Sequence, residues 1–386
     1  MNADVAAGRE EVVRGLTSRA YAGIILQFEY ALYPSGLGDF LDVVAAAGPP
    51  VVVTVHSVNL SGRRKREANR LLGELPAVFV VHSEAQLESL RLAGIPVAAR
   101  AAGIPVAAAR AAIIPMGCPD LSSTFGPRAV VRREMGLGPD EFVVGFFGFA
   151  AAHKGIPNLI RALALLPGVR GYIAATTHPA NPEAVDGIYE ACGFPRLPPG
   201  RGDLGTERRD LGNVVMVHDY LPDRVFGRYQ NAVDVIVLPY ATRGSSVSAS
   251  MLIREALASG RPVIATDIVY FSGLDHEVLR IPDSQPETIA AAIEAVRRDP
   301  GLAASLVMRA RGYAREHSWA KVARRYLDTL SGPGPLGAAV PRPAAVPWSA
   351  AVPWPAGVPR SRGGTPGGPP RHLPGGHRLT APRLVT

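Results

Sequence analysis

Short apolar runs alternate with amphipathic stretches along most of the chain. Apolar runs of strand length occupy residues 24–26, 51–55, 78–81, 143–149, 171–175, 214–218, 235–238 and 263–266. Stretches with helical character lie between them, over residues 62–75, 156–166, 223–232, 247–259 and 287–298. Uninterrupted apolar strands are typical of parallel sheets buried on both faces, and strands that alternate with helices indicate an α/β fold.

The last 56 residues break this pattern. Residues 331–386 contain 13 prolines, 10 glycines and six arginines, with no Asp or Glu. Such a segment buries too little apolar surface to offset the entropy of ordering it, so we expect disorder. Its arginines, with Trp348 and Trp354, leave open a peripheral membrane contact.

The charge and cysteine content exclude several function classes. The formal net charge is +8, of which the tail supplies +6, so the rest of the chain is nearly neutral. We see no basic face interleaved with aromatic residues and expect no nucleic-acid partner. Two cysteines without metal-ligand spacing, and scattered histidines, predict no metal site and a reducing, cytoplasmic location. No apolar run is long enough to span a bilayer, and the first residues lack a secretory signal.

The most informative segment is FVVGFFGFAAAHKGIPNLIRALALL, residues 142–166. An apolar strand with Gly148 leads through a small-residue loop and Lys154 into an amphipathic helix. A glycine-bearing turn, a cation and a helix N-terminus favour a phosphate or diphosphate site, because free N–H groups and the helix dipole attract anions. Lys154 is one of only three lysines among 41 basic residues.

A second segment, GSSVSASMLIREALASGRPVIATD, covers residues 244–267. Its serines are expected at the start of a helix, where they cap it or hold phosphate oxygens. Glu255 follows within the helix. Taken alone, with Arg254 beside it, Glu255 also fits a solvated helix face.

Together, HKGIPNLIRAL and IREALASGRPVIATD resemble the carboxyl-terminal half of family-4 glycosyltransferases. These enzymes have the GT-B fold, in which two Rossmann-like domains with parallel sheets face each other across a cleft. Further similar phrases are LQFEYALYP, VVVTVHSVN, VVHSEAQLESL, IIPMGCPD, VFGRYQNAVDVIVLPY and HSWAKVARRYL. The resemblance covers roughly residues 22–330 and implies five parts: a poorly defined N-terminus (1–20), a partial acceptor-side domain (21–135), a nucleotide-sugar donor domain (136–316), a terminal helix (317–330) and the tail (331–386).

The resemblance implies a role for each candidate residue. Lys154 is expected to contact the donor diphosphate, and Gly148 to let the backbone approach the phosphates. Glu255 is expected to bind the donor ribose hydroxyls. Ser245, Ser246 and Val247 are expected to contact phosphate and sugar. His56 is expected to face the transferred sugar, although a hydrogen-bonded structural histidine explains it almost as well; His82 fits a structural role better, and Glu29 either faces the acceptor or caps its strand.

The family's reaction is also implied. It transfers a sugar from a nucleotide sugar with retention of configuration and without a required metal or other cofactor. The leaving diphosphate assists the incoming hydroxyl, so no protein nucleophile is needed.

The chain departs from the family at three places. Val247 stands where the family usually has its first glutamate, and Phe149 where it usually has an arginine. Only about 20 residues precede the strand that leads into LQFEY, so we expect an incomplete amino-terminal domain, through a misplaced start, a truncation or completion by another chain.

We therefore expect a retaining glycosyltransferase that transfers mannose or glucose to a glycan, lipid-linked or small-molecule acceptor. Two alternatives stay open. One is a catalytically weak or inactive nucleotide-sugar-binding fragment, which Val247 and Phe149 favour. The other is a different GT-B enzyme such as a sugar-nucleotide epimerase, for which no acid/base residues are evident.

Overall fold

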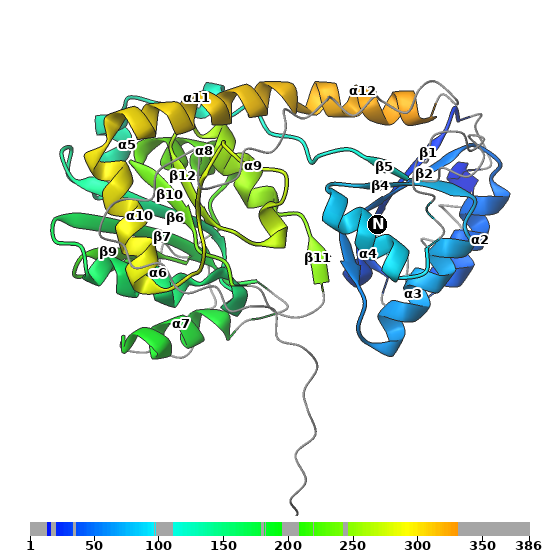
Figure 1. Ribbon diagram of the computed structural model, residues 1–386, viewed down its shortest axis with the longest axis horizontal. Coiled ribbons are helices and arrows are strands. Elements are labelled where there is room, and N and C mark those ends of the chain that lie inside the picture. The colour runs from blue at the N-terminus through cyan, green and yellow to red at the C-terminus, as the bar shows by residue number, and fades with distance from the viewer. Residues whose placement is uncertain are drawn as a thin grey trace, which may run out of the picture. The chain divides into compact units, whose positions relative to one another are not determined.

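A computed structural model describes residues 14–16, 21–33, 36–95, 97, 111–178, 181, 183–194, 208–218, 220–241 and 246–330. The expected disordered tail, nearly all of the expected N-terminal part and Ser245 lie outside the described residues. Within them, the chain forms two separate α/β sheets and a two-stranded ribbon (Figure 1).

The amino-terminal sheet has four parallel strands in the described residues, in the order β1-β2-β4-β5. The strands are β1 (Ile24–Phe28), β2 (Val51–Val55), β4 (Ala77–Val81) and β5 (Ala111–Ile113). Helices α2 (Leu37–Ala46), α3 (Arg63–Glu74) and α4 (Glu84–Leu92) connect them. All five residues of β2 are buried, as its unbroken apolar pattern predicts. The expected strands and charged helix of this part are confirmed.

The carboxyl-terminal sheet has seven strands in the described residues, in the order β13-β12-β10-β6-β7-β9-β8. They are β6 (Phe142–Phe149), β7 (Val169–Thr176), β8 (Arg208–Leu211), β9 (Val214–Val217), β10 (Val235–Leu238), β12 (Val263–Thr266) and β13 (Leu279–Ile281). All pairs are parallel except β8 with β9. The strands expected in this part are therefore confirmed.

Helices cover this sheet on both faces. They are α5 (Arg128–Glu134), α6 (Ile156–Ala164), α7 (Ala184–Cys192), α8 (Asp223–Ala232), α9 (Met251–Ala258), α10 (Pro286–Arg298) and α11 (Pro300–Glu316). Helix α6 packs against α7 and α10, whereas α5 packs against α8 and α9 against α11. The chain moves outward from β6 in both directions, and right-handed crossovers in opposite directions place their helices on opposite faces.

One sequence expectation is wrong in detail. The serines of residues 245–248 were expected at a helix start, but α9 begins only at Met251, with Ser250 as its N-cap residue. Ser246–Ser248 instead form β11, which pairs antiparallel with β3 (Ser57–Asn59). The pairing partner lies about 190 residues away in the sequence, so local periodicity gives no sign of it.

The last described helix, α12 (Trp319–Leu330), returns to the amino-terminal sheet (Figure 1). Its Val322 is buried in a small cluster with Val52, Val80 and Ile114. Just before this helix, the backbones of Cys118 and Ser318 pair in an isolated parallel β-bridge. The segment therefore packs on a part of the molecule to which it is not adjacent in sequence.

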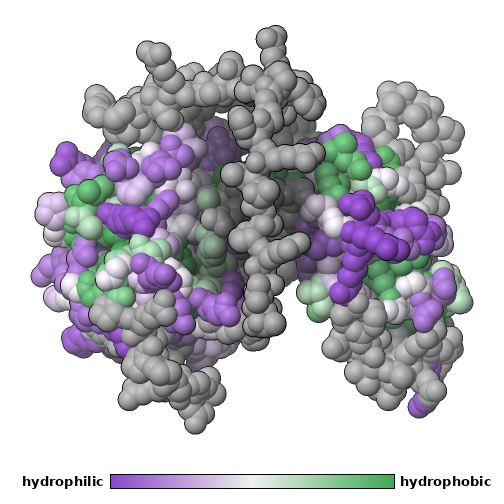
Figure 2. Space-filling view, turned by 90° about the horizontal axis from the view of Figure 1, so that it is seen from below, coloured by the Kyte–Doolittle hydropathy of each residue, from purple (hydrophilic) through white to green (hydrophobic). Residues whose placement is uncertain are grey.

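The described surface is mixed in character. Hydrophilic side chains gather over the half that carries α3, whereas hydrophobic and hydrophilic residues alternate over the other half (Figure 2). Among the described residues, no helix combines the length and apolar character needed to cross a membrane.

Candidate functional site

The carboxyl end of β6 lies at the point where the strand order of the sheet reverses. From β6 the chain proceeds to β7 on one side, whereas β10 is the neighbour on the other side. Ligands of open α/β sheets bind beside such a switch point, at the carboxyl ends of the strands. Gly148 and Lys154 both lie here, as the sequence predicts.

Two glycines, one near the end of β6 and one after it, allow the chain to change direction sharply. Gly148 has φ of +137°, and a Cβ there would lie 3.0 Å from a methyl group of Leu252 and 3.3 Å from Lys154 Nζ. Gly155 has φ of +67°, and a Cβ would collide with the carbonyl oxygen of Pro239. The space at Gly148 is thus used by the Lys154 ammonium itself. The expected approach of phosphates to this backbone stays a prediction.

Lys154 ends the short helix η4 (Ala152–Lys154) and is largely enclosed. Its Nζ lies over the ring of Tyr240, 5.3 Å from the centroid. Burial lowers the pKa of Lys154 to about 8, although the negative charge of Glu255 opposes this shift. A half-buried ammonium at a helix N-terminus is strongly attractive to an anion, because few water molecules compete for it.

Glu255 comes to the same place from α9. Burial raises its pKa to about 7, Asp223 raises it further, and Lys154 lowers it. Among the described residues no direct ion pair joins Glu255 and Lys154, so the two groups are near but leave room between them. Glu255 is half-buried and Arg254 is 3% exposed, which rules out a solvated helix face for this pair.

The remaining predicted donor residues are placed differently. Val247 lies in β11 opposite Val58, and Ser246 lies opposite Asn59. Ser248 Oγ contacts the carbonyl oxygen of Ala249 at 3.3 Å. The structure therefore brings together Lys154, Gly148 and Glu255, whereas Ser246 and Val247 belong to the ribbon with β3.

A second polar cluster surrounds His56, directly after β2. His56 Nε2 lies 2.7 Å from the amide of Gln27, and its Nδ1 lies 3.2 Å from His82 Nε2. Glu29 accepts hydrogen bonds from Ser57 Oγ at 2.8 and 2.9 Å and from the N–H of Tyr30 at 3.0 Å. Glu29 thus caps η1 (Tyr30–Leu32), and His82 is a bonded, buried residue, although one in direct contact with His56.

The hydrogen-bond partners determine the protonation of the two histidines. Burial lowers the pKa of His56 below its usual value and that of His82 to about 4, so both rings are neutral at pH 7. His82 Nδ1 faces the carbonyl oxygen of Ile114 at 2.9 Å and must donate to it. Its Nε2 then accepts from Nδ1–H of His56, and His56 Nε2 in turn needs a donor. The Gln27 oxygen is placed toward His56 and its nitrogen toward Thr54. Because His56 Nε2 needs a donor, we exchange these two atoms and assign the NH₂ group to the His56 side.

This orientation completes a chain of hydrogen bonds that begins on α12. The Gln27 amide lies 3.2 Å from Thr54 Oγ1, which lies 2.9 Å from the hydroxyl of Tyr326. Tyr326 donates to Thr54, Thr54 to the Gln27 oxygen, and Gln27 to His56. Both ring nitrogens of His56 are thus engaged within the protein, and its expected contact with a sugar stays a prediction.

Sequence reasoning missed two residues of the site. Tyr240 follows β10 and supplies the ring beneath Lys154, and also contacts the His153 ring edge-on at 5.7 Å. Arg254 donates to Tyr313 Oη at 2.5 Å and influences His82 electrostatically. A tyrosine at the end of an apolar run is a weak signal for Tyr240, and nothing in the local pattern marks Arg254 as buried.

Phe149, where the sequence resemblance leads us to expect an arginine, ends β6. It is 40% exposed and meets the ring of His178 edge-on, with centroids 4.9 Å apart. An exposed aromatic ring offers a stacking surface instead of a charge, so Lys154 is the cation that the described part of the β6 turn provides.

Comparison with known proteins shows what the chain is similar to. Residues 196–299 match the family model "Glycosyl transferases group 1". The chain is similar to D-inositol 3-phosphate glycosyltransferases of Rhodococcus jostii, at 29% identity over 53% of this chain and 43% of that protein, and of Nocardia farcinica, at 28% over 57% and 47%. The chain thus spans less than half the length of these relatives.

Solved structures extend the similarity to most of the chain. Anabaena Alr3699/HepE in complex with UDP matches with a TM-score of 0.64 at 17% identity, over 85% of this chain and 82% of that one. The fold is GT-B. Sucrose-phosphate synthase from Thermosynechococcus elongatus has a TM-score of 0.62 at 19% identity, over 83% and 76% of the two chains. The trehalose-phosphate synthase of Burkholderia xenovorans, solved with glucose-6-phosphate, also reaches 0.62, at 13% identity over 84% and 76%.

Proposed function

We propose that the chain is a retaining, metal-independent glycosyltransferase that transfers mannose or glucose from a nucleotide-sugar donor to a hydroxyl acceptor. The observation that carries the proposal is the pairing of Lys154 and Glu255 at the switch point of the carboxyl-terminal sheet. The match to group 1 glycosyltransferases over the segment that holds Glu255 supports it.

The two side chains suit the two ends of a nucleoside diphosphate. The Lys154 ammonium offsets the charge that develops on the diphosphate as it leaves, and electrostatic stabilisation of this kind is commonly the largest contribution to catalysis. The Glu255 carboxylate is an acceptor for the hydroxyls of the ribose. The exposed ring of Phe149 offers a stacking surface at the rim of the same site.

The proposed reaction is the one that the sequence resemblance implies. The bond between the sugar C1 and the diphosphate oxygen breaks, and the acceptor oxygen forms its bond to C1 on the same face. The acceptor proton passes to the departing diphosphate oxygen. His56 is proposed to face the sugar, with Gln27 and His82 holding its ring. Lys154 supplies the positive charge that faces the diphosphate, so activity is proposed to survive chelation by EDTA.

The remaining parts of the proposal concern the context of the reaction. The acceptor is a glycan, a lipid-linked molecule or a small molecule, and the location is the cytoplasm. Residues 136–316 are the donor domain and residues 21–135 the acceptor-side domain.

Calorimetric titration with UDP and GDP tests the donor site. We expect Lys154→Ala and Glu255→Ala each to weaken binding of the preferred nucleotide about 10- to 100-fold, because each removes a charge-assisted contact. Lys321→Ala and Glu287→Ala are matched controls, since both residues lie on exposed helical positions of α12 and α10. Unchanged binding in both site variants would disprove the assignment.

The second candidate function is nucleotide-sugar binding without efficient transfer. It is favoured by Val247, which lies in β11 and brings no carboxylate to the donor sugar. Hydrolysis of UDP- and GDP-linked glucose and mannose separates the two functions: a transferase releases the nucleotide slowly without an acceptor, whereas a binding protein leaves the donor intact. The same assay in EDTA tests the absence of a metal requirement.

A further inference from the structure

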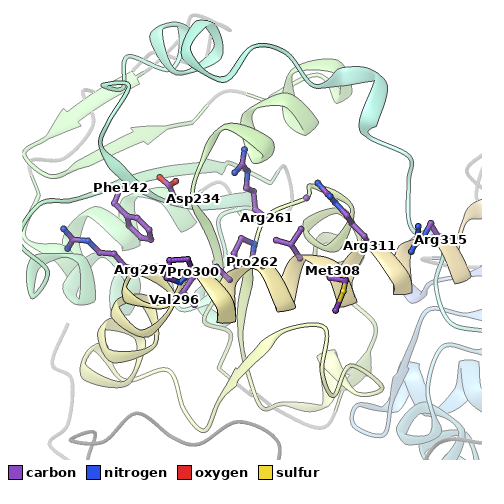
Figure 3. A pocket seen from close by; sticks show the side chains of 14 residues that line it. Phe142, Asp234, Arg261, Pro262, Val296, Arg297, Pro300, Met308, Arg311 and Arg315 are labelled. Carbon is purple, nitrogen blue, oxygen red and sulfur yellow. The ribbon is translucent and has the colours of Figure 1, made fainter.

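A cavity of about 660 Å³ lies at the amino ends of strands of the carboxyl-terminal sheet (Figure 3). The candidate site lies at the carboxyl ends of these strands. The walls of the cavity include Phe142 at the amino end of β6, Asp234 just before β10, and Arg261 and Pro262 just before β12. The length of β6 separates these amino ends from the Gly148 turn by about 23 Å. The cavity is therefore a separate site, of the size that holds a small molecule.

The lining is strongly cationic. Four arginines line it, with Asp234 as the one carboxylate among the lining residues: Arg261, Arg297, Arg311 and Arg315. Asp234 is already engaged elsewhere, because Arg128 donates to its Oδ1, and Arg132 and the N–H of Val143 donate to its Oδ2 at 2.6 and 2.7 Å. Asp234 still acts electrostatically on Arg261, and Glu294 lies 3.6 Å from Arg297, so in the described part of the chain Arg311 and Arg315 are the lining arginines without an ion pair.

Arg261 and Arg311 approach each other from different elements. Arg261 Nε donates to the carbonyl oxygen of Asn231 at 2.5 Å, which fixes the plane of its guanidinium. Gly260 leaves space beside it, and a Cβ there would lie 3.2 Å from a terminal nitrogen of Arg311. Burial and the charges of Arg128, Arg132 and Arg311 lower the pKa of Arg261 to about 10, although the charge of Asp234 opposes this shift. Two guanidinium groups held together in this way are stabilised by a shared anion.

Most of the guanidinium donors of this cluster have no partner. In the described part of the chain, the terminal nitrogens of Arg261 and all nitrogens of Arg311 and Arg315 make no hydrogen bond or ion pair. Arg311 and Arg315 lie one turn apart on α11, so both project from the same side of that helix. Both side chains are exposed, so their donors face solvent and can bind a ligand that enters from there.

The remaining wall of the cavity is apolar. Val296, Pro300, Ala303 and Val307 come from the end of α10 and the first turns of α11. Arg297 lies over the ring of Phe142, 5.8 Å from its centroid. A ligand with a charged end near Arg261 and Arg311 would place its other end against these side chains.

We propose that this cavity binds a small molecule that carries a phosphate ester or a diphosphate on an apolar or flat body. One carboxylate would balance only one guanidinium, whereas a phosphate brings up to two charges and several acceptor oxygens. Phosphate oxygens also match the paired donors of arginine. The proposal is independent of the donor site, which lies at the carboxyl ends of the strands.

Inorganic pyrophosphate is the probe for this cavity. Because the donor site is also proposed to bind diphosphate, every protein in the test carries Lys154→Ala. In that background, Arg311→Gln with Arg315→Gln is compared with Arg309→Gln and Arg324→Gln. The second pair removes the same charge from exposed helical positions outside the cavity.

We expect the first pair to weaken pyrophosphate binding at least tenfold in calorimetric titration and the control pair to change it less than twofold. Arg297→Gln, from the other side of the cavity, is expected to weaken binding too. Equal affinity in the background protein and both double variants, or no binding to the background protein, overturns the proposal.

Vesicles of phosphatidylcholine with phosphatidic acid distinguish two sources of the phosphate. If the background protein sediments with these vesicles and only Arg311→Gln with Arg315→Gln abolishes the sedimentation, the ligand is a lipid phosphate. Pyrophosphate binding without sedimentation supports a soluble phosphate ester. Sedimentation that both pairs reduce equally, without pyrophosphate binding, reflects general surface charge and contradicts the cavity.

Discussion

At the scale of single residues, the site combines two buried charges whose pKa values move toward each other. Burial lowers the pKa of Lys154 to about 8 and raises that of Glu255 to about 7. Both shifts mean that the folded protein disfavours the charged forms, so these residues reduce stability near neutral pH. Such a cost is common at functional sites, where a ligand restores the interactions that solvent would have provided.

The shift at Lys154 predicts how nucleotide binding depends on pH. The charged amine binds the diphosphate, and the free protein loses this charge as the pH rises through about 8. We expect nucleotide affinity to fall up to tenfold per pH unit above pH 8 in titrations between pH 7 and 10.

Lys154→Arg is the matched control for this prediction, because arginine stays charged over the whole range. Its affinity is expected to be nearly constant between pH 8 and 10. A wild-type profile that is equally flat would contradict a titrating Lys154.

Residue-level prediction from sequence succeeds where one short segment contains the whole signal. The strand, turn and helix around Lys154 are contiguous, so the local pattern indicates an anion site without further knowledge. Tyr240 reaches Lys154 from a neighbouring strand, and Arg254 is buried by a contact with Tyr313. Those contacts depend on tertiary packing, which the local pattern of apolar and polar residues does not reveal.

At the scale of elements, helix α12 is joined to His56 by side chains of β1 and β2. The chain of hydrogen bonds runs from Tyr326 through Thr54 and Gln27 to His56. Thr54 is fully buried, so its hydroxyl has no water to replace a lost partner. This element-to-element connection is also beyond sequence reasoning, which placed the helix of residues 317–330 but not its partner strand.

Thr54→Val tests this connection. Valine keeps the shape of threonine but leaves the Tyr326 hydroxyl and the Gln27 amide without a partner. Because Tyr326 is half-buried and Gln27 is exposed, water can replace the lost partner, so we expect the free energy of unfolding to fall by about 0.5–1.5 kcal/mol, the usual net contribution of a hydrogen bond. The nitrogen resonances of His56 are expected to move toward a mixture of tautomers, because Gln27 is no longer held.

Thr266→Val is the control, since Thr266 is equally buried and donates to the carbonyl oxygen of Tyr240 in the other sheet. It is expected to reduce stability without moving the His56 resonances. If both variants leave the His56 resonances unchanged, the chain of hydrogen bonds from Tyr326 does not orient His56.

At the scale of the whole molecule, the two large sheets have separate hydrophobic cores. Leu163 of α6 is buried in the core of the carboxyl-terminal sheet, and Leu72 of α3 in that of the amino-terminal sheet. The sequence indicates the strands of both sheets, because each sheet is built from consecutive strands and helices. It does not predict the ribbon of β3 and β11 or the return of α12, which connect distant segments.

Separate cores predict separate unfolding transitions. Leu163→Ala and Leu72→Ala are each expected to cost about 2–5 kcal/mol, as is typical of a buried leucine truncated to alanine. Hydrogen exchange should assign the loss to the sheet that contains the substitution, while protection in the other sheet changes little. A uniform loss of protection over both sheets in either variant would show that they unfold as one unit.

The close approach of Gly155 to the carbonyl oxygen of Pro239 limits which mutations this position can tolerate. The backbone of the Lys154 loop rests directly on the end of a neighbouring strand, with no room for even one methyl group. Every missense change in the Gly155 codon therefore pushes the loop away from that strand and moves the amine of Lys154 with it. In a mutational scan selected for activity, this position is expected to accept no other amino acid, while the exposed helical Gly187 tolerates many.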